Sequence, residues 1–157
     1  MTTAIFRNRV YILVAPGFEE AAVIYCLTQL REVGLPVSLV GLVAGQIAGW
    51  HGLSICPDLT LDEVDAQEPM KLAVIPGGQQ CATTLLTDPR VHRLLHTLIA
   101  QEGRVGVMGT AIPVVTQFGL LPESMDGHYV LQNEESMDGF MAELVSLMLN
   151  HSVVLND

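Results

Sequence analysis

RVGVMGTAIPVV, at residues 104–115, is an apolar run that ends in small residues and restarts after a proline. The residues before Gly109 suit a buried parallel strand, Gly109 and Ala111 permit a tight corner, and Pro113 fits the first turn of a helix. The stretch therefore predicts a strand, a sharp turn and a helix. Such a corner exposes one side chain, Thr110 or Gly109, at the carboxyl edge of a sheet, where the N–H groups of the next helix point at it.

Two other stretches show the same change from strand to turn. Residues 72–78, LAVIPGG, are an apolar run that ends in Pro-Gly-Gly, and residues 10–20, VYILVAPGFEE, are a strand pattern whose loop delivers acidic side chains to the start of a helix. Paired glycines let a chain turn with its backbone amides unobstructed. The loops after residues 75 and 108 are therefore expected to frame an anion pocket.

The rest of the chain alternates between strand and helix patterns. Strands are expected over residues 10–15, 36–42, 72–75, 105–108 and 128–131, and helices over residues 19–33, 81–86, 88–102, 112–119 and from 136 onward. Between them we expect a hairpin or excursion over residues 44–52, a return to the sheet edge at residues 53–56, a short acidic helix over residues 58–67 and a turn-rich connection over residues 121–127. This alternation predicts an α/β domain with a mostly parallel sheet.

The composition excludes several classes of protein. The 157 residues suit a single domain, residues 1–157, and only 7 Lys and Arg face 17 Asp and Glu, a net charge of −10. Nucleic acid is excluded as a partner, because phosphate binding needs clustered basic side chains. Cys26, Cys56 and Cys81 have no paired spacing, which favours a reducing cytoplasm, and no metal or cofactor is expected. No export or membrane segment is expected either.

The order of these motifs over residues 9–118 resembles the ThiJ/PfpI superfamily, the intracellular protease/amidase group related to class I glutamine amidotransferases. The motifs are GFEE at residues 17–20, ICPD at residues 55–58, PGG at residues 76–78 and the corner that ends in Pro113. The resemblance implies a flavodoxin-like three-layer α/β/α sandwich that is usually dimeric. It also implies an elbow cysteine, a glutamate from the first helix and often a histidine.

The chain departs from this family pattern at the residues that would carry the chemistry. Counting back from Pro113 places the nucleophilic cysteine of the family on Thr110, and counting on from Gly17 places its glutamate on Ala22. The segment before the last helix is short, and His128 is its one histidine. We interpret the chain as a divergent, non-catalytic member that lacks the nucleophilic cysteine. The retained pocket is expected to comprise Glu19, Gly77, Gly78, Thr110 and Ala111. His128 either lines this pocket too or is a surface histidine of the strand over residues 128–131.

Two side chains offer an alternative in which the protein is an enzyme. A threonine hydroxyl is less ionised near pH 7 than a cysteine thiol by roughly seven orders of magnitude, so Thr110 needs a nearby base, and Glu19 and Glu20 are the available carboxylates. A β-branched residue is also disfavoured at the positive φ of an elbow, although Gly109 beside it can take that strain. Cys81 follows the Pro-Gly-Gly turn. It either opens a helix at the rim of the pocket, where the helix N-terminus would lower its pKa, or is a small buried residue of the core.

These patterns leave three functions open. The retained pocket is expected to bind a small anionic metabolite through the Gly78 and Ala111 amides, or the protein acts on partners through a homodimer surface. Trp50 and His51 either cap such a dimer or pocket edge or are an ordinary loop pair. The first alternative is a hydrolase, amidase or glyoxalase-like enzyme that uses Thr110 or Cys81. The second is a stress-responsive holdase or redox sensor.

Overall fold

The computed structural model describes residues 9–64, 69–120, 128–132 and 136–156, and the side chains of the last helix as far as Leu149. The first eight residues, where no export signal is expected, and the turn-rich connection predicted over residues 121–127 lie outside these ranges. Within the ranges, no helix combines the length and apolar composition needed to cross a bilayer.

The described residues form a six-stranded sheet in the order β5-β2-β1-β6-β7-β8, with every neighbouring pair of strands parallel. The strands are β1 (Arg9–Val14), β2 (Val37–Gly41), β5 (Leu59–Thr60), β6 (Met70–Ile75), β7 (Arg104–Met108) and β8 (Tyr129–Gln132). β1 and β6 are almost wholly buried, as continuous apolar strands covered on both faces must be. The parallel sheet that the sequence predicts is confirmed.

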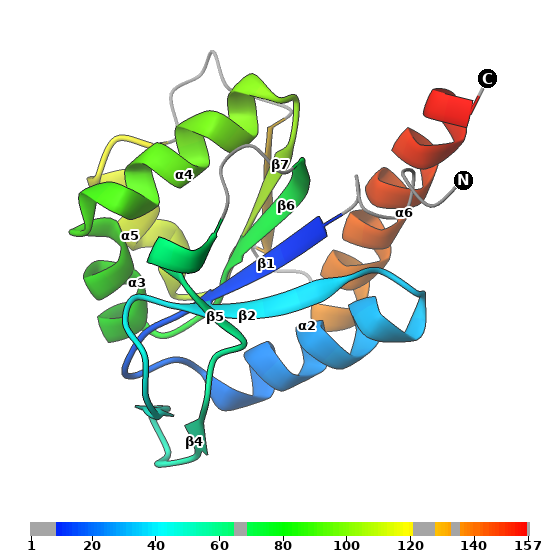
Figure 1. Cartoon of the computed structure of the whole chain (residues 1–157). Helices are drawn as coiled ribbons and strands as arrows, with labels where there is room; N and C mark the ends of the chain where they lie inside the picture. Colours follow the sequence, from blue (N-terminus) through cyan, green and yellow to red (C-terminus); the bar gives the residue numbers. More distant parts are fainter. Residues whose placement is uncertain (1–8, 65–68, 121–127, 133–135, 157) are drawn as a thin grey trace.

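Helices cover both faces of this sheet (Figure 1). α2 (Glu20–Glu32) and α6 (Met137–Asn156) lie on one side, and α3 (Gln79–Leu86), α4 (Pro89–Ala100) and α5 (Ala111–Gln117) lie on the other. α4 begins where the sequence predicts, because Asp88 accepts a hydrogen bond from the Arg90 N–H at 2.9 Å and Pro89 occupies the first turn. The arrangement is a three-layer α/β/α sandwich.

The order of the strands places a crevice between β1 and β6. From β1 the chain runs outward through β2 to β5, whereas from β6 it runs the other way through β7 to β8. In open parallel sheets, ligands bind outside the carboxyl ends of the strands at this reversal. The loops after β1, β6 and β7 meet at that point. They carry the GFEE motif, the PGG motif and the corner around Thr110.

One prediction on the β5 side of the sheet is wrong. Residues 53–56 do not return to the sheet edge, because β4 (Ser54–Ile55) pairs antiparallel with β3 (Ile47–Ala48) in a separate hairpin. The edge strand is β5, fixed by Asp58, whose carboxylate accepts the Leu39 N–H at 2.8 Å. Of the short acidic helix expected over residues 58–67, the described part as far as residue 64 contains a 3-10 turn, η1 (Leu61–Glu63), closed by a capping box between Thr60 and Glu63, and residues 65–67 lie outside the described residues.

Candidate binding site at the carboxyl edge of the sheet

The corner after β7 is built by Gly109 and Thr110. Gly109 has a φ of 47°, whereas Thr110 has a φ of −69° and a ψ of −7° and directly precedes α5. The left-handed conformation therefore falls on the residue that has no Cβ. The backbone of Thr110 is therefore unstrained. The sequence allows for this, because Gly109 can adopt the positive φ in place of Thr110.

The Thr110 side chain joins two loops. Its Oγ1 accepts a hydrogen bond from the backbone N–H of Gly78 at 2.8 Å. Gly78 precedes α3 with a φ of 112°, and a Cβ there would run into the carbonyl oxygen of Gly17. The Gly78 N–H is expected from the sequence to bind an anionic ligand, but in the structure it donates to Thr110 instead.

Glu19 adds the loop after β1 to the same junction. Its backbone N–H donates to the Gly77 carbonyl at 2.9 Å, and its half-buried carboxylate packs against Gly77, where a Cβ would collide with Oε2. The structure thus brings Glu19, Gly77, Gly78 and Thr110 together, with Ala111 next to Thr110 in the chain. The three loops depend on two glycines to approach this closely.

His128 does not belong to this site. It precedes β8, its backbone carbonyl accepts the Val105 N–H, and its Nδ1 lies 3.2 Å from the Gly103 carbonyl oxygen. These partners flank the start of β7, whereas Thr110 follows the end of that strand. The length of β7, roughly 15 Å, separates the two. Parallel pairing of β8 with β7 therefore places His128 at the opposite edge of the sheet, and its expected place in the pocket is wrong.

Cys81 lies in the first turn of α3, as predicted, but it is not at the rim of a pocket. Its side chain is completely buried, and this burial raises the pKa of the thiol to about 12, outweighing a hydrogen bond with the backbone of Ala15 that lowers it. Loss of water disfavours the thiolate, so the lowered pKa expected at this helix N-terminus is not found. Cys26 is also buried, with its pKa raised to about 12, whereas Cys56 is exposed.

Glu20, rather than Glu19, fixes the neighbouring hairpin. Its carboxylate accepts hydrogen bonds from the backbone N–H groups of His51, at 2.6 Å, and Leu53, at 3.3 Å, and its Oε1 lies 3.0 Å from His51 Nδ1. Burial works to raise its pKa, but the hydrogen bonds from His51 and Leu53 outweigh it and bring the pKa to about 2. The sequence gives no direct sign of these contacts, because 31 positions separate Glu20 from His51.

Trp50 forms one wall of a pocket beside Thr110. The pocket has a volume of about 230 Å³, and Gly17, Trp50, Gln79, Gln80 and Thr110 line it. Trp50 is 69% exposed, stacks on His51 with ring centroids 5.5 Å apart, and donates its backbone N–H to the Phe18 carbonyl at 2.9 Å. Of the residues expected in the retained pocket, Thr110 is the one in this lining, and Trp50 lies at a pocket edge, as one of its two interpretations predicts. Sequence reasoning missed Gln79 and Gln80, although they directly follow the Gly-Gly turn.

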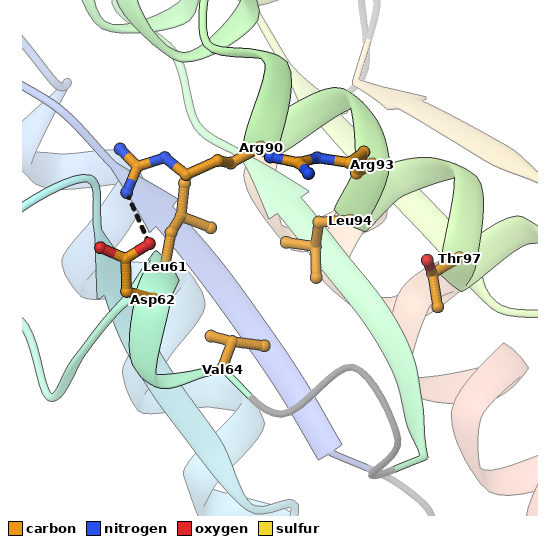
Figure 2. A pocket seen from close by; sticks show the side chains of 7 residues that line it. All are labelled: Leu61, Asp62, Val64, Arg90, Arg93, Leu94 and Thr97. Atoms are coloured by element: carbon orange, nitrogen blue, oxygen red, sulfur yellow. Dashed lines mark hydrogen bonds and ion pairs between the residues drawn. The ribbon is translucent and has the colours of Figure 1, made fainter.

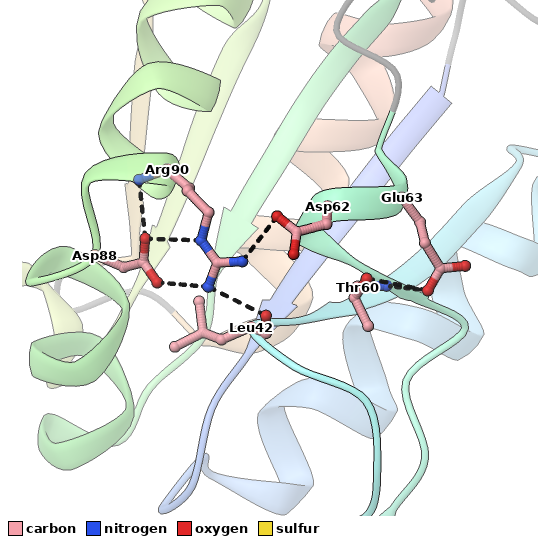
Figure 3. A network of polar contacts seen from close by, with 6 residues as sticks. All are labelled: Leu42, Thr60, Asp62, Glu63, Asp88 and Arg90. Atoms are coloured by element: carbon pink, nitrogen blue, oxygen red, sulfur yellow. Dashed lines mark hydrogen bonds and ion pairs between the residues drawn. The ribbon is translucent and has the colours of Figure 1, made fainter.

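A second, wider pocket lies between η1 and α4 (Figure 2). It has a volume of about 320 Å³ and is lined by Leu61, Asp62, Val64, Arg90, Arg93, Leu94 and Thr97. Arg90 is tied at its rim to Asp88, Asp62 and the Leu42 carbonyl, so it serves to join α4 to the β2 side of the sheet (Figure 3). None of the residues lining this pocket is in the junction around Thr110. This pocket is larger than the one beside Thr110, but it lies away from the junction of the three loops, so it is not the candidate site.

The fold and the corner after β7 define a flavodoxin-like α/β protein with an elbow at the carboxyl edge of its sheet. The family model of the DJ-1/PfpI family matches residues 8–143, and the chain belongs to that family. In the described residues, no group of three or more His, Cys, Asp or Glu side chains is placed to hold a metal ion.

Several curated relatives match parts of the chain. It is 41% identical over 83 residues to a deglycase from Thermococcus kodakarensis, a match that covers 53% of this chain and 49% of the relative. It is 30% identical over 102 residues to the Parkinson disease protein 7 homolog from Danio rerio, covering 64% and 52%. The chain thus spans about half the length of these relatives. An uncharacterized protein from Archaeoglobus fulgidus is 38% identical over 165 residues, covering 89% and 98%.

Solved structures confirm the fold. Oxidized DJ-1 from Toxoplasma gondii superposes with a TM-score of 0.79 at 20% identity, and a mutant of a DJ-1 superfamily protein from Salmonella typhimurium with a TM-score of 0.77 at 23% identity. Each alignment covers 91% of both chains. At this identity the likeness bears on the fold alone.

Proposed function

We propose that the pocket beside Thr110 binds a small molecule without covalent catalysis, and that the chain is a DJ-1/PfpI protein without the nucleophile of the family. The hydrogen bond from the Gly78 N–H to Thr110 Oγ1 at 2.8 Å carries this proposal. Through this hydrogen bond, the oxygen at the elbow position serves as a structural acceptor that joins two loops. A hydroxyl acts as a nucleophile only when a base takes its proton.

The acidic groups near the elbow support the same conclusion. Glu20 accepts hydrogen bonds from His51 and Leu53, and its pKa of about 2 makes it a poor proton acceptor. Glu19 packs on Gly77, and the buried Ala22 stands where the resemblance places the glutamate of the family. The buried Cys81 thiol, with its raised pKa, is a poor substitute nucleophile.

The deglycase names of several relatives favour an enzyme as the second candidate function. In that case Thr110 acts as the nucleophile through a base supplied by the substrate or by a rearranged Glu19. The stress-related alternative depends on a reactive Cys81, and the burial of that thiol disfavours it.

One turnover experiment separates these functions. Methylglyoxal and an activated ester are given separately to the wild type and to the Thr110→Ala and Cys81→Ser variants under the same conditions. We expect no turnover above the protein-free blank in any of the three. Turnover that one substitution abolishes would replace this proposal with an enzyme whose nucleophile is the substituted residue.

The assembly and compartment of the protein are also proposals. Val43 and Leu53 are exposed on or beside the β3-β4 hairpin and do not line the pocket beside Thr110, which supports burial of this part of the hairpin in a homodimer. All three cysteines are free thiols, which supports a reducing cytoplasm. Light scattering on a sizing column is expected to give twice the mass of the chain.

A further inference from the structure

The lining of the pocket beside Thr110 has no formal charge. Its residues are one glycine, one tryptophan, two glutamines and one threonine. In the part of the chain that the structure describes, the loop after β1 brings two carboxylates to the surroundings of this lining, Glu19 against Gly77 and Glu20 against the β3-β4 hairpin. Arg9, Lys71 and Arg104 stand at the first residues or the starts of β1, β6 and β7, at the opposite edge of the sheet. The lining therefore offers an anion no cationic side chain to pair with.

The polar groups of the lining suit a ligand that both donates and accepts hydrogen bonds. Each glutamine amide carries two donor hydrogens and an acceptor oxygen, and the Thr110 hydroxyl, which accepts from Gly78, has its own proton to donate. Gln80 lies against Gly17, where a Cβ would come within 2.7 Å of Oε1. The missing side chain of Gly17 therefore leaves space for the Gln80 amide beside the pocket.

The aromatic wall is held in place by the neighbouring hairpin. Gly17 donates its N–H to the Ala48 carbonyl and Trp50 donates to the Phe18 carbonyl, each at 2.9 Å. Glu20 fixes the next turn through His51, and a Cβ at Gly49 would come within 2.6 Å of the Glu20 Cδ atom. The Trp50 ring is therefore a positioned, exposed surface on which a flat group can stack.

We infer that this pocket binds a small neutral molecule with a flat primary-amide group, which stacks on Trp50 and exchanges hydrogen bonds with Gln79, Gln80 and Thr110. This inference rests on the proposed function and names the ligand class of the same pocket. It replaces the expected anionic metabolite with a neutral one. A carboxylate of the same shape lacks the amide donors and meets no cationic side chain in the lining.

Trp50 is the one tryptophan of the chain, so its fluorescence reports on this pocket alone. Benzamide and benzoate are the probes, because they have the same shape and differ in charge at pH 7.5. We expect a saturable change in Trp50 emission with benzamide and an affinity for benzoate that is about tenfold weaker or less. Gln80→Ala is expected to weaken benzamide binding at least about fivefold, whereas Gln117→Ala, an exposed glutamine at the end of α5, is expected to leave it unchanged.

Each other outcome overturns the inference. Benzoate binding as tightly as benzamide would show a pocket without the proposed preference for a neutral ligand. A lack of saturation with benzamide up to its solubility, or equal losses in Gln80→Ala and Gln117→Ala, would remove the amide site. None of these results requires covalent catalysis, so the turnover of the ester and of methylglyoxal tests the proposed function separately.

Discussion

Thr110 and Gly78 are 32 positions apart in the chain, and the Oγ1 atom of the first accepts the backbone N–H of the second at 2.8 Å. The bond joins the loop after β7 to the loop after β6 at the crevice beside β1. Gly78 itself is buried, so its N–H has no ready access to water. The elbow position, which the resemblance assigns to a nucleophile, is here a structural contact.

Loss of the Thr110 hydroxyl is expected to destabilise the fold. Thr110→Val keeps the shape of the side chain and leaves the buried Gly78 N–H without its acceptor, which costs about 1–3 kcal/mol. Thr110→Ser restores the oxygen and most of the stability. Urea denaturation measures both variants. The control is Thr116→Val, whose exposed hydroxyl donates to the Ile112 carbonyl within α5, and we expect it to change stability by less than about 0.5 kcal/mol.

Gly78 is expected to tolerate a side chain less well than another glycine with positive φ. Gly78→Ala brings a Cβ against the Gly17 carbonyl oxygen, whereas Gly34→Ala, at a φ of 86°, meets open space. Both variants bear the cost of a left-handed residue, about 1 kcal/mol, and Gly78→Ala adds a backbone clash. The denaturation midpoint of Gly78→Ala is therefore expected to be lower than that of Gly34→Ala, and equal midpoints would contradict the close approach of the two loops.

We expect Cys56 to react with thiol reagents much faster than Cys26 and Cys81 in the native protein. Cys56 is exposed, whereas Cys26 and Cys81 are buried with pKa values raised to about 12. A chromogenic disulfide reagent should modify one thiol per native chain at pH 8 and three in denaturant. Cys56→Ser should then show almost no fast reaction. Rapid labelling of Cys81 in the native protein would instead favour the redox alternative.

Glu20 is expected to make stability depend on pH in the acid range. Its pKa falls from 4.5 to about 2 on folding, so the ionised form stabilises the fold above about pH 4.5, and this contribution disappears as the pH falls toward 2. The difference in unfolding free energy between the wild type and Glu20→Gln should therefore shrink as the pH falls from 5 to 2.5. Glu32→Gln, at the exposed end of α2, is the control. A difference that stays constant over this range would contradict the assigned hydrogen bonds.

The strands and helices that bury apolar faces can be predicted from the sequence, because their apolar residues recur with the period of a helix or form the continuous run of a buried strand. The stripe of α4 and the continuous apolar runs of β1, β6 and β7 are of this kind. The prediction from periodicity fails at residues 53–60, where the edge strand has two residues and is fixed by Asp58, a contact made across 19 positions. A single long-range hydrogen bond leaves no periodic signal.

The candidate site was predictable in its backbone and not in its lining. Gly109, Gly77 and Gly78 mark the loops that meet, because only glycine fits such turns and close approaches. The lining depends instead on where a hairpin folds back, which brings Trp50 to Thr110 although 60 positions separate them. His128 shows the converse, since it precedes its strand rather than following it and so reaches the other edge of the sheet.

Peptide mapping by mass spectrometry after treatment with an activated ester tests the central claim most directly. We expect the peptide containing Thr110 to carry no acyl group, because its oxygen accepts the Gly78 N–H. Among the residues that the structure describes, Glu20 has a lowered pKa and Glu19 packs on Gly77, so neither carboxylate is placed to take its proton. Acylation is expected only at ordinary surface nucleophiles such as Cys56. An acyl group on Thr110 that forms rapidly in the wild type and is absent from Thr110→Ala would contradict the account and identify the residue as a nucleophile.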